Sequence, residues 1–273
     1  MDPESGRPRR PRIWDADAGR GPYRAAVTID IASLAERPDL APLLDEDFAG
    51  AWPPFMLWDP MGSVYYSVAH DLYPEFVFAA VDPAEPGRAI ARAYAVPLRW
   101  TEPELPDGGW DRMIQRATID RLTGAETTIV SALEICVRPE RRGGGLSALM
   151  LDAMRRAAAK QGYDTLVAPV RPNGKHTQPD LSMTEYAARV RADGLPVDPW
   201  LRVHVRAGGR IERVATRSMT IAGTLADWRR WTGLPFDVSG PVRVPGALVP
   251  VHCDVAHDHA VYVEPNVWVR HRL

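Results

Sequence analysis

Residues 133–149 pass from a strand pattern through a glycine-rich turn into a helix pattern. The apolar run ends at Val137, the turn carries three arginines and three consecutive glycines, and apolar residues recur at helical spacing from Leu146 onward. Such a turn directs several backbone N–H groups into one small volume at the positive end of a helix dipole. The stretch therefore predicts a strand and a helix joined by a site for a phosphate or pyrophosphate.

The elements on both sides of this turn are well specified. Residues 127–137 are apolar on both faces, which is typical of a central strand in a covered sheet. The helix expected over 146–160 has no acidic side chain in its first turn, so its positive dipole end is free for an outside anion. The next strand, 164–170, contains Pro169, which cannot donate to a sheet ladder, and pairing should therefore fail on one side there.

Glu134 interrupts the apolar strand. On a period of two it shares a face with Val130, Ala132 and Cys136, so its carboxylate would point into an apolar layer. In one interpretation, strand twist carries Glu134 to solvent or to an arginine partner. In the other, the carboxylate has a raised pKa and accepts a proton near neutrality, which makes Glu134 a candidate catalytic base.

The remaining elements follow from apolar patterns and from residues that break them. Two short helices are expected over 33–48, where two prolines interrupt a helical pattern. Further strands are expected at 23–31, 76–81, 89–96 and 210–221 and two more within 247–270, and further helices at 110–122, 183–191 and 225–232.

Residues 200–214 fit two structures. Apolar and polar side chains alternate along them as in a hairpin strand, and this count alone favours the strand. A cap at Asp198, a first helical position at Pro199 and a terminator at Gly208 would instead frame a helix of about nine residues.

Aromatic residues crowd into positions 52–73. Aromatics at this density usually build a core, and they also suit the wall of a ligand pocket, so both interpretations stay open. The residues are Trp52, Phe55, Trp58, Tyr65, Tyr66 and Tyr73.

Composition narrows the class of protein. The 273-residue chain has a formal net charge of -2, which gives no global electrostatic reason to expect nucleic acid. Residues 1–21 are rich in Pro, Gly and Arg and are expected to form a tail, followed by a single domain over 22–273. No run approaches about 18 apolar residues, so we expect no membrane partner and a soluble, cytoplasmic protein. The sequence leaves open whether the chain forms a homodimer.

Cysteine and histidine spacing gives no sign of a disulfide framework or a metal site. Cys136 and Cys253 lie far apart in the sequence, and neither belongs to a CxxC pair. One cluster of candidate metal ligands fits no familiar ligand spacing, so we expect no metal. It consists of His252, Cys253, His257, Asp258 and His259.

The glycine-rich turn resembles the acetyl-CoA-binding signature of the GNAT superfamily of acyltransferases. The core of that signature is Arg or Gln, two residues, Gly, one residue, then Gly or Ala, and Arg142, Gly145 and Ser147 stand at its three specified positions. Val137 and Pro139 match the Val-x-Pro that commonly precedes it. Ser147 departs from the pattern, but it is small enough to let a pyrophosphate approach the backbone.

This resemblance is close over 127–170 and looser over 198–221. It implies an α/β (α+β) fold with a mixed, mostly antiparallel central sheet and helices on both faces. It also implies that the strand ending at Val137 and the strand 164–170 splay apart, which admits the pantetheine arm of CoA. Residues 172–197 would then be an insertion and residues 222–273 a C-terminal extension.

The resemblance also implies where the donor would lie. The CoA pyrophosphate would rest on the N–H groups of residues 142–147 and the thioester carbonyl on the Val137 amide, with Glu134 deprotonating the acceptor amine directly or through water. The residues expected to bind CoA are Ile135, Val137, Arg141, Arg142, Gly143, Gly144, Gly145, Leu146, Ser147 and Asn173.

A general acid for the departing thiolate follows from the looser part of the resemblance. The family often carries Tyr-x-x-x-Gly on the helix after the second strand, and placing Gly208 on that glycine puts His204 at the tyrosine position. This register favours a helix over 199–207, and it makes His204 the expected proton donor. Tyr186 and Tyr163 are the alternatives.

The predicted activity is acyl transfer, most simply of acetyl from acetyl-CoA, to an amine of a small metabolite by direct attack on the thioester. Peptide or protein N-termini are the next acceptor class. The missing tyrosine leaves open a CoA-binding sensor or partner module without activity, and the turn alone would suit another phosphate ligand such as a nucleotide. The acceptor pocket is expected among 52–73, 172–197 and 222–273, the parts least like a minimal family member.

Overall fold

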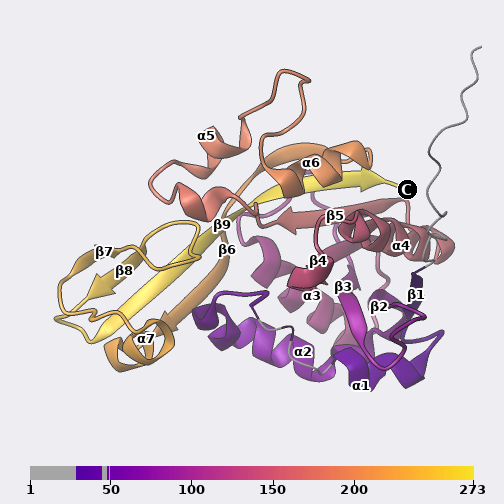
Figure 1. The fold of residues 1–273 in the computed structure, drawn as a ribbon, viewed down its shortest axis with the longest axis horizontal. Helices are drawn as coiled ribbons and strands as arrows, with labels where there is room; N and C mark the ends of the chain where they lie inside the picture. The colour runs from indigo at the N-terminus through magenta and orange to yellow at the C-terminus, as the bar shows by residue number, and fades with distance from the viewer. Residues whose placement is uncertain (1–28, 45–47, 49) are drawn as a thin grey trace, which may run out of the picture.

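The computed structural model describes residues 29–44, 48 and 50–273, which build one nine-stranded sheet with helices around it (Figure 1). The strand order is β1-β2-β3-β4-β5-β9-β8-β7, and β6 also pairs with β9. The strands are β1 Asp30–Ser33, β2 Val77–Val81, β3 Ala89–Leu98, β4 Ile129–Val137, β5 Thr165–Val170, β6 Arg210–Gly223, β7 Gly240–Val242, β8 Val251–Asp254 and β9 His259–Arg272.

Seven α-helices and five short 3-10 helices are described. The α-helices are α1 Ala41–Leu44, α2 Pro60–Leu72, α3 Gly109–Thr123, α4 Leu146–Lys160, α5 Met183–Ala187, α6 Pro199–Arg206 and α7 Leu225–Thr232. The 3-10 helices are η1 Pro38–Leu40, η2 Pro54–Trp58, η3 Pro74–Phe76, η4 Pro139–Arg141 and η5 Lys175–Thr177. Among these described helices, none is both long enough and apolar enough to cross a membrane.

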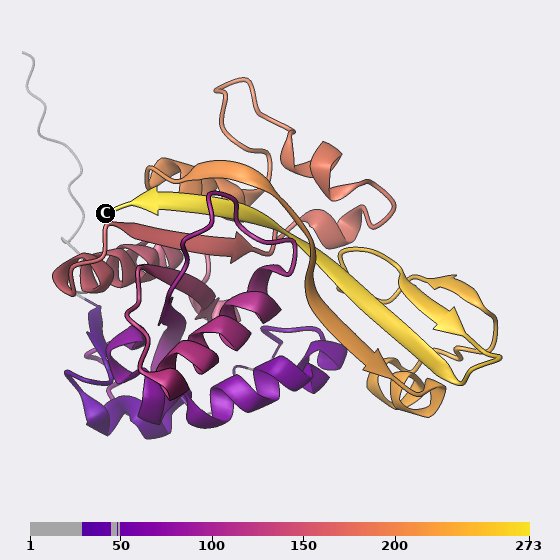
Figure 2. The same cartoon turned by 180° about the vertical axis from the view of Figure 1, so that it is seen from behind.

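The sheet is antiparallel except at its centre, which confirms the predicted fold class. The described strand pairs are antiparallel, apart from the parallel pair β4–β5. Helix α4 packs against β3 and β4, and α3 packs against β3 and β6. The two opposite views place α4 on one face of the sheet and α3 on the other (Figures 1 and 2).

The parallel pair is short, and this opens the sheet. Strand β4 pairs with β5 only at Val130 with Leu166 and at Ser131 with Val167. Strand β5 nevertheless stays paired with β9 along its whole length, through Pro169 and Val170. The pairing failure predicted at Pro169 is therefore confirmed, and it falls on the β4 side. Beyond Ser131, β4 and β5 splay apart.

For residues 200–214, the sequence left a strand and a helix open, and the local cap and terminator signals predicted the correct one. These residues form helix α6 and then β6, with Asp198 Oδ1 accepting the backbone N–H of Trp200 at 2.9 Å and of Leu201 at 3.0 Å. Gly208 follows the helix with a φ of 83°, a left-handed conformation that glycine adopts readily. The cap and the terminator thus outweighed the alternation, which had favoured a strand.

The aromatic segment is partly core and partly pocket wall, so both interpretations of it hold. Phe55, Tyr65 and Tyr73 are buried in the core. Trp52 and Tyr66 line cavities. Within this segment, α2 was not predicted, although Asp59 caps it and Pro60 occupies its first turn.

The C-terminal region is less separate than expected. Strand β9, which lies within 222–273, pairs with both β5 and β6 and so belongs to the central sheet. The long strands β6 and β9 run beyond the other strands into a lobe that carries α7, β7 and β8 (Figures 1 and 2). The division into tail, domain, insertion and extension stays a prediction. The expected tail and residues 23–28 of the first expected strand lie outside the described residues.

Candidate active site

The glycine-rich turn joins β4 to α4 with the conformation that its sequence predicts. Gly143 has a φ of 85° and Gly145 a φ of 80°, and Gly145 occupies the N-cap position of α4. No side chain caps this helix, and no acidic residue lies in its first turn. The N–H groups at the start of α4 are therefore available to an anion.

The splay exposes a second set of backbone donors, on β4. The N–H of Arg138 donates to Ile90 O on β3 at 3.1 Å. Because neighbouring residues of an antiparallel strand direct their N–H groups to opposite sides, the N–H of Val137 points away from β3, toward the gap beside β5. A carbonyl oxygen in that gap could accept from Val137, as the resemblance implied.

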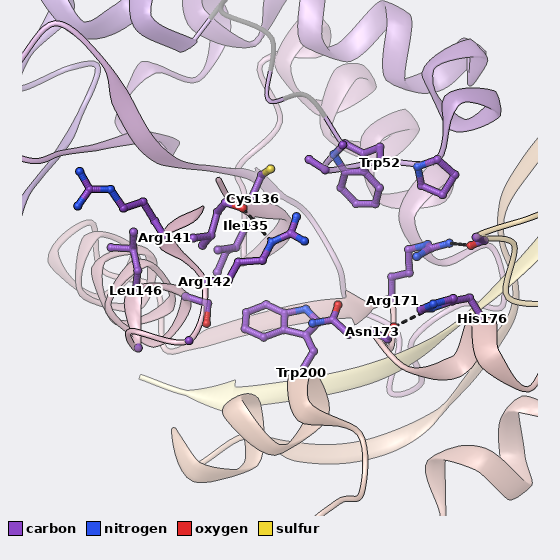
Figure 3. A pocket seen from close by; sticks show the side chains of 18 of the residues that line it. Trp52, Ile135, Cys136, Arg141, Arg142, Leu146, Arg171, Asn173, His176 and Trp200 are labelled. Atoms are coloured by element: carbon purple, nitrogen blue, oxygen red, sulfur yellow. Dashed lines mark hydrogen bonds between the residues drawn. The ribbon is translucent and has the colours of Figure 1, made fainter. Parts of the chain in front are cut away.

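A cavity of about 590 Å³ lies over the turn and the splay (Figure 3). Of the ten residues expected to bind CoA, all except Gly144 line it. Arg141, Arg142 and Arg171 contribute to the wall, and none of the described residues that line it is an aspartate or glutamate. Its charge therefore suits a polyanion. We call it the donor cavity.

Arg141 and Arg142, two of the three arginines of the turn, have different roles. Arg141 donates to Asp82 at 3.0 Å and contacts Glu85 at 3.0 Å, so it holds the turn to the loop after β2. Arg142 Nε donates to Val137 O at 3.2 Å. Figure 3 shows Arg142 reaching into the space between Trp52 and Trp200, while Arg141 points away from it. Arg142 is thus the better placed of the two to contact a phosphate.

A smaller cavity of about 220 Å³ adjoins the donor cavity and shares Trp52, Ile135 and Arg171 with it. We call it the acceptor cavity. Its wall carries the carboxylates of Asp59 and Glu134, the arginines Arg92 and Arg171, and aromatic and aliphatic side chains, among them Tyr66. The two cavities meet beside β4, where the strands splay.

Glu134 lies in the acceptor cavity wall, and its side chain is only 2% exposed. Its Oε1 accepts from Arg92 Nε at 2.7 Å, and its Oε2 accepts from Tyr66 Oη at 2.8 Å. Each of the two interpretations of Glu134 therefore describes part of the observed geometry. The carboxylate has an arginine partner, and it faces the place where an acceptor could bind.

The structure contradicts the general-acid role expected for His204. His204 is buried, lines neither cavity, and pairs through Nδ1 with His271 Nε2 at 3.0 Å. Burial, followed by the charge of His271, lowers the pKa of His204 to about 3, so the ring is neutral near pH 7 and has no proton to spare for a thiolate. His204 is a core residue of α6.

The tyrosine alternatives also lie outside both cavities. Tyr186 donates to Asp198 Oδ2 at 3.0 Å, and Tyr163 Oη lies 2.6 Å from Thr127 Oγ1. Neither of them lines the donor or the acceptor cavity.

Sequence reasoning missed several residues that line the donor cavity, among them Arg171, His176 and Trp200. Trp200 follows Pro199 at the start of α6. The helical alternative for 199–207 therefore already placed Trp200 in the first turn of this helix. Arg171 directly follows β5, which ends at the splay. His176 lies in the 3-10 helix η5, which no local sequence pattern predicted.

Metal ligation has no support in the described part of the chain, where no group of three His, Cys, Asp or Glu side chains could hold an ion. Cys136 lines the donor cavity, and burial raises the pKa of its thiol to about 12. The thiol therefore stays protonated at neutral pH and is a poor nucleophile.

Comparisons with known proteins agree with this geometry. No model of a known protein family matches the chain. A curated relative, the arginine N-acetyltransferase avaD of Aspergillus versicolor, is 31% identical over 271 residues, which cover 89% of this chain and 93% of the relative.

Two solved structures share the fold. The loading GNATL domain of CurA from Lyngbya majuscula matches 90% of this chain and 98% of its own, with a TM-score of 0.57 and 17% identity. The GphF GNAT-like decarboxylase in complex with isobutyryl-CoA matches the same shares, with a TM-score of 0.51 and 18% identity. The two solved structures show the fold, and the curated relative shows that the chain belongs to the GNAT superfamily of N-acyltransferases.

Proposed function

We propose that this enzyme transfers acetyl from acetyl-CoA to the primary amine of a small molecule that enters the acceptor cavity. The observation that carries the proposal is the meeting of the two cavities beside β4, at Trp52, Ile135 and Arg171. One cavity is cationic and lies on a helix N-terminus, and the other contains carboxylates. A donor and an acceptor would therefore approach each other from opposite sides of the splay.

The donor side supports a defined placement of CoA. The pyrophosphate lies on the N–H groups at the start of α4, with Arg142 as the nearest cation of the turn. The pantetheine arm follows the unpaired edge of β4, and the thioester oxygen accepts from Val137 N–H. That hydrogen bond strengthens as negative charge develops on the oxygen in the transition state.

The acceptor side supports direct attack on the thioester. Glu134 accepts the amine proton, directly or through water, because its carboxylate lies in the acceptor cavity wall beside the splay. The amine nitrogen forms a bond to the thioester carbon, and the C–S bond breaks to release the CoA thiolate, which takes a proton from the surrounding water. The protonated thiol of Cys136 favours this route over an acyl-cysteine intermediate.

The acceptor is a small amine. The avaD relative is named for arginine, and a cavity of about 220 Å³ accommodates a molecule of amino-acid size. Its aromatic walls and carboxylates suit a molecule with both an aliphatic stem and positive charge. We therefore take arginine and its amine analogues as the first acceptors to test.

The experiment measures thiol release from acetyl-CoA with a panel of amines and, in parallel, CoA binding by calorimetry. The proposal expects CoA binding together with amine-dependent thiol release. CoA binding without thiol release for any amine would instead favour a sensor module. Competition by a nucleotide that lacks pantetheine, with affinity equal to that of CoA, would overturn the assignment of the donor cavity.

A further inference from the structure

Two carboxylates near the acceptor cavity each have one buried oxygen without a partner: Asp59 lines the cavity, and Asp111 is a half-buried residue outside the cavity wall. Asp59 is 3% exposed, and its Oδ1 accepts from Met61 N at 3.1 Å, whereas its Oδ2 is buried and has no hydrogen-bond partner. Asp111 Oδ2 accepts from Thr220 N at 3.0 Å, and its Oδ1 is likewise buried without a partner. Buried acceptors are normally satisfied, so each orphan oxygen needs an explanation.

Neither carboxylate has a cationic neighbour to neutralise it within the described residues, where no ion pair includes Asp59 or Asp111. Glu264 lies near both of them, but its Oε2 is already paired with Arg171 Nε at 2.9 Å. Burial raises the pKa of Asp59 to about 6. Burial, and then the charge of Asp59, raises the pKa of Asp111 to about 7. Arg92 and Arg171 also line the acceptor cavity, but they are paired with Glu134 and Glu264, so within the described part of the chain Asp59 and Asp111 have no cation of their own.

The two side chains come from helix starts that the fold brings together. Asp59 is the N-cap of α2, and Asp111 lies in the first turn of α3. Helix α3 begins against β6, because Trp110 N donates to Ser218 Oγ at 2.9 Å. Trp110 itself lines the acceptor cavity beside Asp59.

A glycine keeps the space beside Asp59 open. Gly62 lines the acceptor cavity, and a Cβ added to it would lie 3.5 Å from Asp59 Oδ2 and 3.6 Å from the Trp110 ring. Without that methyl group, no side chain of residue 62 covers Asp59, which lines the cavity next to it. The site therefore combines an open space, an aromatic wall and unpaired carboxylate oxygens.

We propose that Asp59 and Asp111 bind the second, cationic group of the acceptor, a guanidinium or an ammonium at the end remote from the reacting amine. This inference rests on the proposed function. A planar guanidinium carries five N–H donors in a fixed fork, so it can donate to more than one carboxylate and offset one of their negative charges. Asp59 and Asp111 are then specificity-determining residues, while Glu134 serves the amine.

The position of the pair favours binding over proton transfer. Asp59 and Asp111 belong to α2 and α3, whereas the splay that receives the thioester is formed by β4 and β5. Glu134 and its neighbour Ile135 lie on β4, where the two cavities meet. An acceptor that extends from Glu134 to Asp59 therefore has its reactive amine at the donor end and its second charge at the far end.

The test compares arginine with citrulline, which has the same stem and a neutral urea in place of the guanidinium. Thiol release from acetyl-CoA gives kcat/KM for each acceptor. In the unaltered enzyme we expect arginine to be preferred by about 100-fold, since each charge-assisted hydrogen bond contributes a factor of roughly 10 to 100. Asp59→Asn and Asp111→Asn should each lower kcat/KM for arginine by roughly 10- to 100-fold and change the value for citrulline little.

The asparagine substitutions preserve the oxygens that accept from Met61 and Thr220, so the helix cap and the contact with β6 can persist. Asp39→Asn is the matched control, because it removes one exposed carboxylate that is paired with Arg37. It should leave the ratio of arginine to citrulline unchanged.

A second measurement needs no variant. Calorimetry near pH 6.3, with CoA bound and in two buffers of different ionisation enthalpy, counts the protons released when an acceptor binds. Arginine should displace protons from the carboxylate pair, and citrulline should displace fewer, because it brings no cationic side chain.

The outcomes separate this inference from the proposed function. Thiol release that no amine stimulates would remove the proposed function itself. Thiol release at equal rates with arginine and citrulline, together with equal proton release, would keep the function and overturn the cation site. If both asparagine variants lose activity equally with the two acceptors and flatten the pH–rate profile, the pair is the catalytic base and the inference is wrong.

Discussion

Replacing Gly145 by alanine should weaken CoA binding, whereas the fold should lose only the cost of backbone strain at this position. Gly145 has a φ of 80°, so an alanine there would cost about 1–2 kcal/mol of left-handed strain. No protein atom lies within 4 Å of the added Cβ, so the substitution causes no clash in the free enzyme. The methyl group would project beside the turn where the pyrophosphate is proposed to lie.

The expected loss of affinity follows from the hydrogen bonds at that turn. If the methyl group displaces the pyrophosphate from one N–H donor, about 1.5–3 kcal/mol is lost, which corresponds to roughly a 10- to 150-fold rise in the Kd for CoA. Isothermal titration calorimetry measures this Kd directly. Thermal unfolding should show a decrease in Tm of only about 2–4 °C.

Gly162 offers a matched control at the other end of α4. It has a φ of 91° and, like Gly145, would have no protein atom within 4 Å of an added methyl group, but it does not line the donor cavity. Gly162→Ala should therefore lower Tm by a similar amount and leave the Kd for CoA unchanged. Equal CoA affinities for the two variants would refute the role of the turn.

Three further predictions concern single side chains. Glu134→Gln should lower kcat by about 10²- to 10⁴-fold, and a pH–rate profile identical to that of the unaltered enzyme would remove Glu134 as the base. Trp200→Ala should raise the Kd for CoA by about 10-fold, because the indole forms part of the donor cavity wall, and an unchanged Kd in calorimetry would contradict this contact. Burial lowers the pKa of His204 to about 3 and of His271 to about 4, so both rings are neutral in the folded protein. In the unfolded chain they take up protons below about pH 6.5. The stability that depends on their burial is therefore present above about pH 6.5 and is lost as the pH falls toward 4. His204→Asn should accordingly weaken the acid dependence of the unfolding free energy and keep kcat/KM at pH 7.5 within about threefold, whereas a collapse of kcat/KM in a folded variant would restore a catalytic role.

Local sequence signals predicted the centre of the fold and the donor side of the site. The two glycines with positive φ, the absence of an acidic first turn in α4 and Pro169 on β5 each act within a few residues of the chain. Their structural effects therefore follow from conformational preference and hydrogen-bond capacity alone. The curated relative and the shared fold confirm the family that this stretch indicated.

The acceptor side depends on contacts between segments far apart in the sequence, which no local pattern reveals. Asp59 and Asp111 belong to separate helices, and Arg92 reaches Glu134 across 42 positions. The general-acid role expected for His204 is contradicted for a related reason. Aligning Gly208 with the glycine of the family motif predicted helix α6 correctly. It could not show that His271, at the end of β9, would pair with the His204 imidazole in the core.

The most direct test of the proposed function is a mass balance of one reaction. Enzyme, acetyl-CoA carrying an isotopic label in the acetyl group, and arginine are incubated together, and free CoA and labelled acetylarginine are quantified by mass spectrometry. Direct transfer in the adjoining cavities predicts equal amounts of both products, formed only when the amine is present. Free CoA without labelled amide, or no free CoA with any amine of the panel, would contradict it.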